Sequence, residues 1–289
     1  MRLIVGNGVI GKLLSVHWKK SEIMHHVSTR HRHQMQDHLP FINLSSKVKF
    51  SFQEVYSTAI LCAGNSNVLE CRNDPIGTRT INLDGTINLA RYLETQGAQI
   101  IFISSDKVFS GGNGNRSPED PVDPTTEYGR QKAEAEEEIL KLENAAVLRL
   151  TKVVYPSQPL LQGWQASLKL GKPITAFSDM WFAPVSFNMV LKMIDLLIER
   201  NAIGIWHVSS THEITYKAAA DHLAECFGVD RKLVQSGLAM GETRYNREED
   251  SRYASLDMEK TLRWDITPQH PIDTIHHEIC ILNSNQAIL

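Results

Sequence analysis

The stretch RLIVGNGVIGKLL (residues 2–14) joins an apolar run to a helical pattern through three glycines. RLIVGN (2–7) predicts a buried strand, and VIGKLLSVHWKK (9–20) predicts the helix behind it. Glycines at G-x-G-x-x-G spacing allow a tight turn there and let a pyrophosphate approach backbone N–H groups at a helix N-terminus. The alternative is a merely structural turn. We expect a dinucleotide to bind at Gly6, Gly8, Val9, Ile10 and Gly11.

The rest of the first half alternates short apolar runs with helical patterns, which favours βαβ units around a parallel sheet. Further strands are predicted at 22–29, 57–64, 98–105 and 145–150, and helices at 78–97 and 126–144. We therefore predict an α/β fold with a Rossmann-type, doubly wound parallel sheet.

The pattern changes beyond residue 155, where prolines and glycines, among them Pro156, Pro159 and Gly163, divide the chain into short pieces. A helix at 188–200, a strand at 204–210 and a helix at 216–228 follow. We expect a dinucleotide-binding domain over 1–155 and a smaller α/β substrate-binding lobe over 156–289, from which some chain can return to the first domain.

Composition excludes several classes of protein. The 289 residues carry a formal net charge of −3, so they lack the basic surface by which a nucleic-acid binder neutralises phosphates. No run of 18 apolar residues predicts a membrane span, and glycines interrupt the apolar N-terminus where a signal peptide would need continuity. We expect a cytoplasmic protein with neither nucleic acid nor membrane as partner.

The cysteines and histidines show no familiar metal-binding spacing. Cys62, Cys71, Cys226 and Cys280 are far apart, so reduced structural thiols are expected. We predict solvated loops rather than ligands for the histidine-rich segment 24–38, with its His25, His26, His31, His33 and His38, and for His276 and His277. The sequence therefore predicts no metal.

The segment VSTRHRH (27–33) follows the second predicted strand, where many dinucleotide-binding folds place an acidic residue against the adenine ribose. Here hydroxyls and guanidinium groups stand instead, and these suit a 2′-phosphate. A solvated basic loop is the alternative. We expect NADP(H) in preference to NAD(H), with contacts from Ser28, Thr29, Arg30 and Arg32.

The segment YGRQK (128–132) places a tyrosine four residues before a lysine on a predicted helix. Positions i and i+4 share a helix face, so Tyr128 and Lys132 can address one site, although a solvated face would show the same pattern. Ser104 and Ser105 end a predicted strand, and strand ends of a parallel sheet are where such folds bind ligands.

Together, the glycine motif, SSDKVFSG (104–111), SPEDPVDPTTEYGRQKAEAE (117–136) and SRYASLDMEK (251–260) resemble the extended short-chain dehydrogenase/reductases, most closely the dTDP-4-dehydrorhamnose reductase group. The resemblance implies a catalytic set of Ser105, Tyr128 and Lys132, with Ser104 as the alternative for the first. It also implies cofactor contacts from Ala63, Gly64, Asn82, Ser104 and Lys132, and substrate contacts from Ser105, Asp106, Val108 and Tyr128.

In that set Tyr128 would protonate the developing alkoxide, and Ser105 would bind the carbonyl oxygen. Lys132 would hold the nicotinamide ribose and lower the pKa of Tyr128, which is about 10 in a free tyrosine. Trp164 and Trp181 could stack on a nucleotide base, or they could be local core.

We therefore expect an NADP(H)-dependent reductase of a nucleotide-linked 4-keto-6-deoxy sugar, as in dTDP-rhamnose biosynthesis, and many relatives of this kind are homodimers. One alternative is a catalytically silent regulatory subunit, as in the β subunit of methionine adenosyltransferase. Another is a nucleotide-sugar epimerase or dehydratase. It is less favoured because Asp106 is followed by Lys107 rather than by a second acid, and because Arg30 and Arg32 fit NAD⁺ poorly.

Overall fold

The computed structural model describes residues 1–31, 39–45, 50–239 and 252–281. The chain forms two compact units. The first comprises Met1–Val108, Val122–Arg149 and Leu191–Trp206, and the second takes the described residues of Phe109–Pro121, Leu150–Val190 and His207–Leu289. The division is thus discontinuous: a short early segment joins the second unit, and 191–206 returns to the first.

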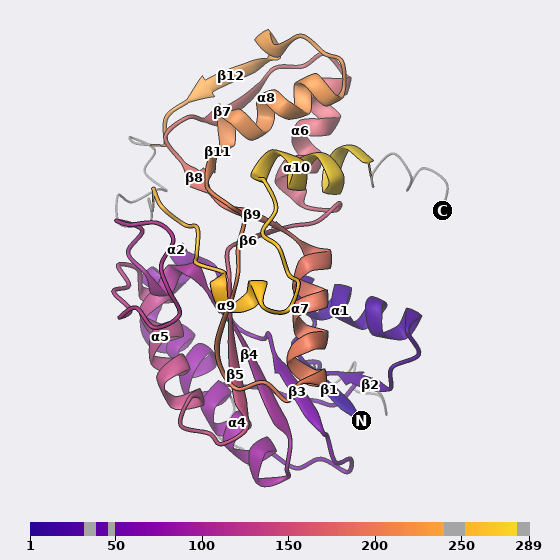
Figure 1. Cartoon of the computed structure of the whole chain (residues 1–289), viewed down its shortest axis with the longest axis vertical. Helices are drawn as coiled ribbons and strands as arrows, with labels where there is room; N and C mark the ends of the chain where they lie inside the picture. Colours follow the sequence, from indigo (N-terminus) through magenta and orange to yellow (C-terminus); the bar gives the residue numbers. More distant parts are fainter. Residues whose placement is uncertain (32–38, 46–49, 240–251, 282–289) are drawn as a thin grey trace. The chain divides into compact units, whose positions relative to one another are not determined.

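The first unit is built on the predicted Rossmann-type sheet (Figure 1). Its six strands lie in the order β10 (Gly204–Val208), β5 (Ala145–Leu150), β4 (Gln99–Ser105), β3 (Thr58–Leu61), β1 (Arg2–Val5) and β2 (His25–Val27). The parallel register sets Ile4 of β1 beside both Val27 of β2 and Ile60 of β3. Continuous apolar runs form these strands because both sheet faces are covered.

Helices cover the sheet on both faces (Figure 1). The helices α1 (Val9–Lys20) and α7 (Phe187–Glu199) are joined where Trp18 Nε1 donates to Asp195 Oδ1 at 2.9 Å. On the other face, α4 (Thr86–Thr95) and α5 (Glu127–Ile139) pack on the sheet. Their apolar side chains join those of the strands in one core cluster, which includes Leu89, Leu93, Ala135 and Ile139.

The region 78–97 was predicted as one helix, but the structure divides it among the end of α3 (Pro75–Arg79), the π-helix η2 (Thr80–Gly85) and α4. The short α2 (Val68–Asn73) precedes them. The wider turn of a π-helix changes the direction of its side chains, and such turns are common at functional sites. Here it lies where Asn82 is buried.

The second unit has its own core and its own small sheets. Pro159, read as a breaker, is instead the first residue of α6, a position that proline favours. The strand pairs are β7 (Ile174–Phe177) with β12 (Val234–Gly237), β8 (Trp181–Phe182) with β11 (Ile214–Thr215), and β6 (Lys152–Val154) with β9 (Pro184–Ser186). The helices are α6 (Pro159–Lys169), α8 (Tyr216–Cys226), α9 (Glu259–Leu262), α10 (Pro271–Ile275) and the π-helix η6 (His276–Ile281).

Within the described ranges, every helix is too short or too polar to cross a bilayer.

Candidate active site

The glycine turn between β1 and α1 lies close to the turn that follows β3. Gly6 adopts a φ of +113°, and a Cβ there would lie 2.8 Å from the Ala63 backbone, so only glycine allows this approach of the two turns. Gly8 caps α1, and a Cβ there would have no neighbour within 4 Å. Gly11 is buried, and Val9 and Ile10 are at least partly exposed in the first helical turn. Open space therefore lies beside Gly8 at the N-terminus of α1.

The segment after β2 is fastened to the glycine turn. Gly6 N donates to Ser28 Oγ at 2.9 Å. Ser28 and Thr29 are buried, and Arg30, which follows them, is exposed. Arg32 lies outside the described residues. The hydroxyl of Ser28 thus positions the turn, while Arg30 extends from the same place.

Asn82 connects the turn after β3 to the helix α5. Its Oδ1 accepts from Asn65 N at 2.7 Å, and its Nδ2 donates to Asn65 O at 2.9 Å and to Gln131 Oε1 at 2.8 Å. A Cβ on Gly64 would lie 3.0 Å from Asn82 Oδ1. Since both amide protons of Asn82 are used within the protein, its side chain acts as a positioning group beside Ala63 and Gly64.

The two serines at the end of β4 have different environments. Ser104 is buried and its hydroxyl donates to Glu136. Ser105 is partly exposed, and its Oγ donates to Asp106 Oδ1 at 2.8 Å. Alternation along a strand sends neighbouring side chains to opposite faces. The predicted roles of Ser104 in catalysis and cofactor binding are therefore corrected to a structural one, and Ser105 remains.

Tyr128 and Lys132 lie in the first half of α5, which Thr126 caps by accepting from Gly129 N at 3.0 Å. A Cβ on Gly129 would lie 2.1 Å from Lys107 O, so glycine lets the start of the helix approach the segment that follows β4. This approach brings the Tyr128 side chain into a hydrogen bond with Ser105.

The buried Lys132 reaches back toward the same strand. Its Nζ donates to Ile103 O at 2.8 Å and lies 4.3 Å from the centre of the Phe102 ring. Burial lowers the pKa of Lys132 to about 8, partly offset by the Glu136 carboxylate. The ammonium is thus held at one place under the strand end.

The pKa of Tyr128 is raised, chiefly by burial and next by the Asp106 carboxylate, while the hydrogen bond with Ser105 opposes the shift. The expected lowering of the Tyr128 pKa is therefore wrong for the protein itself, because burial and the Asp106 carboxylate determine the net shift. The phenol keeps its proton at neutral pH, which suits a proton donor.

Three further residues were predicted to contact the substrate, and they differ in how far they are buried. Val108, in the short helix η3 (Asp106–Val108), has no exposed surface, so its predicted side-chain contact with substrate is corrected to packing. Trp164 is 7% exposed within the core of the second unit and meets Tyr216 edge-on, which favours local core over stacking on a base. Trp181 is partly exposed in β8.

A buried ion pair beneath the site was not predicted from the sequence. Arg149 Nη2 lies 2.7 Å from Glu136 Oε2, with both side chains at most 3% exposed. Two signals could have indicated it: an arginine within the apolar strand AAVLRL (145–150), and a glutamate four residues after Lys132 on the same helix face. The pair joins α5 to β5, and the hydrogen bond from Ser104 to Glu136 joins β4 to them.

Comparisons with known proteins agree with this architecture. The family described as the RmlD substrate binding domain matches residues 1–273. The chain is 33% identical over 129 residues to methionine adenosyltransferase 2 subunit beta of Bos taurus, an alignment that covers 44% of this chain and only 36% of that protein.

The chain is also 23% identical over 223 residues to dTDP-4-dehydrorhamnose reductase of Streptomyces griseus, covering 72% of this chain and 73% of that protein. Its fold matches the crystal structure of dTDP-4-dehydrorhamnose reductase from Bacillus anthracis in complex with NADP, with a TM-score of 0.79 and 18% identity over 96% of this chain and 97% of that one. The chain therefore belongs to the RmlD substrate binding domain family, within the extended short-chain dehydrogenase/reductases.

Proposed function

We propose that the chain is an NADP(H)-dependent reductase of a nucleotide-linked 4-keto-6-deoxy sugar. The observation that carries this proposal is the assembly of Ser105, Tyr128 and Lys132 at the end of β4. The glycine turn follows β1 of the same parallel sheet. Carboxyl ends of parallel strands meet at one edge, where such folds bind nucleotides.

The residues divide the work of carbonyl reduction among them. When bound, the dihydronicotinamide supplies a hydride to the carbonyl carbon. Tyr128 Oη donates its proton to the carbonyl oxygen, so that the ketone becomes a secondary alcohol and the phenol becomes a phenolate. Ser105 Oγ hydrogen-bonds the same oxygen as negative charge develops. The Lys132 ammonium offsets the charge of the phenolate until a solvent proton restores the phenol.

The cofactor is proposed from the turn and from the segment after β2. The open space at Gly8 fits a pyrophosphate, and the exposed Arg30 fits a 2′-phosphate. The Bacillus anthracis structure that shares the fold is a complex with NADP. NAD(H) is the alternative cofactor.

A catalytically silent regulatory subunit is the second candidate. It is favoured by the 33% identity with methionine adenosyltransferase 2 subunit beta. In that function the glycine turn would still hold a dinucleotide, and Tyr128 would not transfer a proton.

The decisive experiment measures NADPH and NADH oxidation by the purified protein with dTDP-, GDP- and CDP-linked 4-keto-6-deoxy sugars. Tyr128→Phe should lower turnover by about 100-fold or more, because the donated proton is lost, while NADPH affinity is retained. Tyr92→Phe, a tyrosine of α4 in the same unit, is the matched control. Equal turnover in Tyr128→Phe would contradict the catalytic assignment. NADPH binding without turnover of any sugar would favour the regulatory subunit.

The cofactor preference has its own test. Arg30→Ala combined with Arg32→Ala should raise the KM for NADPH at least about 10-fold and leave that for NADH nearly unchanged, since only NADPH carries the 2′-phosphate. Arg91→Ala, another exposed arginine of the first unit, is the control. An unchanged NADPH-to-NADH ratio would remove Arg30 and Arg32 from the cofactor site.

A further inference from the structure

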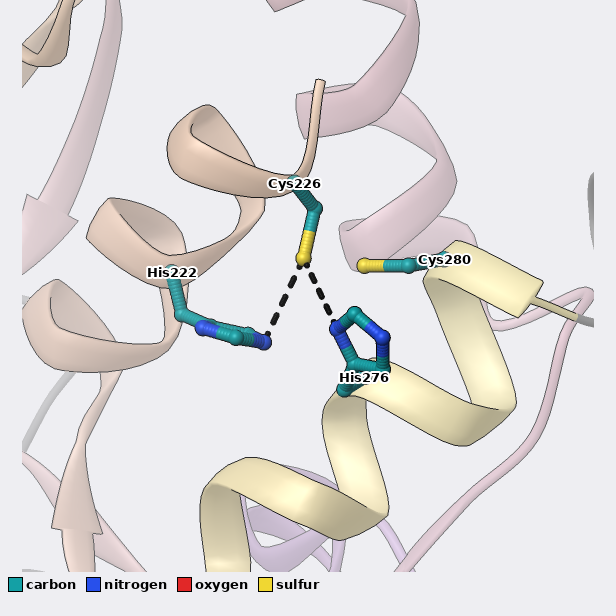
Figure 2. Close-up of side chains that lie close together, drawn as sticks. All are labelled: His222, Cys226, His276 and Cys280. Atoms are coloured by element: carbon teal, nitrogen blue, oxygen red, sulfur yellow. Dashed lines mark hydrogen bonds between the residues drawn. The ribbon is translucent and has the colours of Figure 1, made fainter. Parts of the chain in front are cut away.

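Two helices of the second unit each present a histidine and a cysteine to the other (Figure 2). His222 and Cys226 lie four residues apart on α8, and His276 and Cys280 have the same spacing on η6. The four side chains converge from the two helices. None of them belongs to the glycine turn or to the catalytic set, so the proposed reductase activity does not explain them.

The distances between these side chains are those of a nearly formed coordination shell. Cys226 Sγ lies 3.3 Å from His222 Nε2 and 3.2 Å from His276 Nδ1. One ligand atom from each of the four residues lies within 4.8 Å of all the others. A tetrahedral zinc ion holds sulfur at about 2.3 Å and nitrogen at about 2.0 Å, so its ligand atoms stand roughly 3.3–3.8 Å apart. Small side-chain rotations would bring this group to that geometry.

The two helices are fixed by the core around them. Leu223 and Ala224 of α8, Ile275 of α10 and Ile279 of η6 are all buried in one apolar cluster. The backbone positions of the ligands therefore do not depend on the ligands themselves. Such a site is pre-organised, and binding a metal would order few additional residues.

An outer carboxylate accompanies the group. The second ring nitrogen of His222, Nδ1, lies 3.9 Å from Glu225 Oε2, and Glu225 Oε1 is 3.0 Å from Arg231 Nη1. Histidine ligands of metals commonly direct their other nitrogen to a carboxylate, and Glu225 would have to move closer than this 3.9 Å separation to form that hydrogen bond. His276 is exposed, so an ion can enter from solvent.

We propose that His222, Cys226, His276 and Cys280 form a structural zinc site that joins α8 to the helices near the C-terminus. Two thiolates and two imidazoles in tetrahedral arrangement are the ligands that zinc prefers. Two thiolates also balance the charge of Zn²⁺. Four protein ligands close the shell and leave no position for substrate, so the ion stabilises the second unit and takes no part in hydride transfer.

The first measurement is the metal content of the protein after purification under reducing conditions and dialysis. We expect about one zinc per chain. Metal-free protein titrated with Co²⁺ should show the intense visible bands of a tetrahedral site and a thiolate charge-transfer band. Cys226→Ser combined with Cys280→Ser should lose both the zinc and the charge-transfer band. Cys62→Ser and His212→Ala, a thiol of the first unit and an exposed histidine of the second, should keep them.

Thermal unfolding gives an independent readout. A chelator should lower the Tm of the wild-type protein by at least about 4 °C, because the ion binds only the folded second unit. It should not change the Tm of the double serine variant. If that variant folds poorly, the Co²⁺ spectrum of the wild type and the single variants Cys226→Ser and Cys280→Ser decide the matter.

Three results would overturn the proposal. The first is reduced protein without zinc that also gives no tetrahedral Co²⁺ spectrum, which would leave only a hydrogen-bonded polar cluster. The second is zinc retained by the double serine variant, which would place the ion elsewhere. The third is a Cys226–Cys280 disulfide in the isolated protein whose reduction creates no metal affinity.

Discussion

Asn82 Nδ2 donates a 2.8 Å hydrogen bond to Gln131 Oε1, and this bond joins the π-helix η2 to the helix that carries Tyr128 and Lys132. The same Asn82 amide holds both backbone groups of Asn65 in the turn after β3. One buried side chain therefore links the turn after β3 to the helix α5.

Replacing Asn82 should consequently damage both stability and turnover. Asn82→Ala leaves the polar groups of Asn65 and Gln131 without this partner, and we expect it to lower the free energy of unfolding by about 1–3 kcal/mol. Turnover should fall more than NADPH affinity, since Tyr128 is displaced. Urea unfolding and steady-state kinetics measure the two effects. Asn88→Ala, an exposed position on α4, is the control, and equal behaviour of the two variants would contradict the positioning role.

Replacing one partner of the buried Glu136–Arg149 ion pair should strongly lower the free energy of unfolding. Glu136→Gln leaves the Arg149 guanidinium buried without its countercharge, and we expect a loss of about 3–5 kcal/mol in the free energy of unfolding. The double variant Glu136→Leu with Arg149→Met should recover much of that loss. Arg130→Ala breaks the exposed pair with Glu127 and should cost under about 1 kcal/mol. Similar losses for the buried and the exposed pair would contradict this account.

Asp106 should tune the proton donor. Its carboxylate is the second cause of the raised pKa of Tyr128, so Asp106→Asn should lower the pKa of the phenol. The alkaline limb of the pH dependence of kcat should then move to lower pH. Asp84→Asn, an exposed acid of η2, should leave that limb in place. An unmoved limb in Asp106→Asn would mean that this carboxylate does not act on Tyr128.

Lys132 should make the free energy of unfolding depend on pH. Burial lowers the pKa of Lys132 to about 8, opposed by Glu136, Cys62 and Cys71, whereas the unfolded chain keeps about 10.5. Between these values the unfolded state binds more protons than the folded one, so the free energy of unfolding rises with pH. The wild type should therefore gain up to about 3 kcal/mol relative to Lys132→Met between pH 8 and pH 10.5.

Chemical denaturation at a series of pH values measures that difference, because tyrosines and cysteines that titrate in the same range are common to both proteins. The exposed Lys172→Met should show no such slope relative to the wild type. A difference between wild type and Lys132→Met that stays constant with pH would contradict a lowered pKa for Lys132.

The sequence predicted the elements that repeat a regular pattern. The helix at 9–20 and the strand at 145–150 have the predicted bounds, because an apolar face or an apolar run defined each. The π-helix η2 was not predicted. Its extra residue per turn changes the apolar spacing of Ile81, Leu83 and Ile87 too little to distinguish it from an α-helix. The helix α6 was missed because Pro159 was read as a break rather than as a first residue.

The directions in which individual side chains point could not be predicted from the sequence. Ser104 and Ser105 are equivalent as letters, and only the strand register sends one to Glu136 and the other toward Tyr128. The cluster of His222, Cys226, His276 and Cys280 was not predicted for a different reason. Cys226 and His276 are 50 positions apart, and only the packing of α8 against η6 brings their ligand atoms together.

The most direct test of the reductase proposal follows the hydride itself. The protein is incubated with NADPH carrying deuterium at the reactive C4 position, in each stereochemistry, and with the dTDP-linked 4-keto-6-deoxy sugar, and the product is analysed by mass spectrometry and NMR. We predict deuterium on the former carbonyl carbon for one stereochemistry with the wild type, and none with Tyr128→Phe. A protein that binds NADPH but transfers deuterium to no nucleotide-linked ketone would contradict the reductase and favour the regulatory subunit.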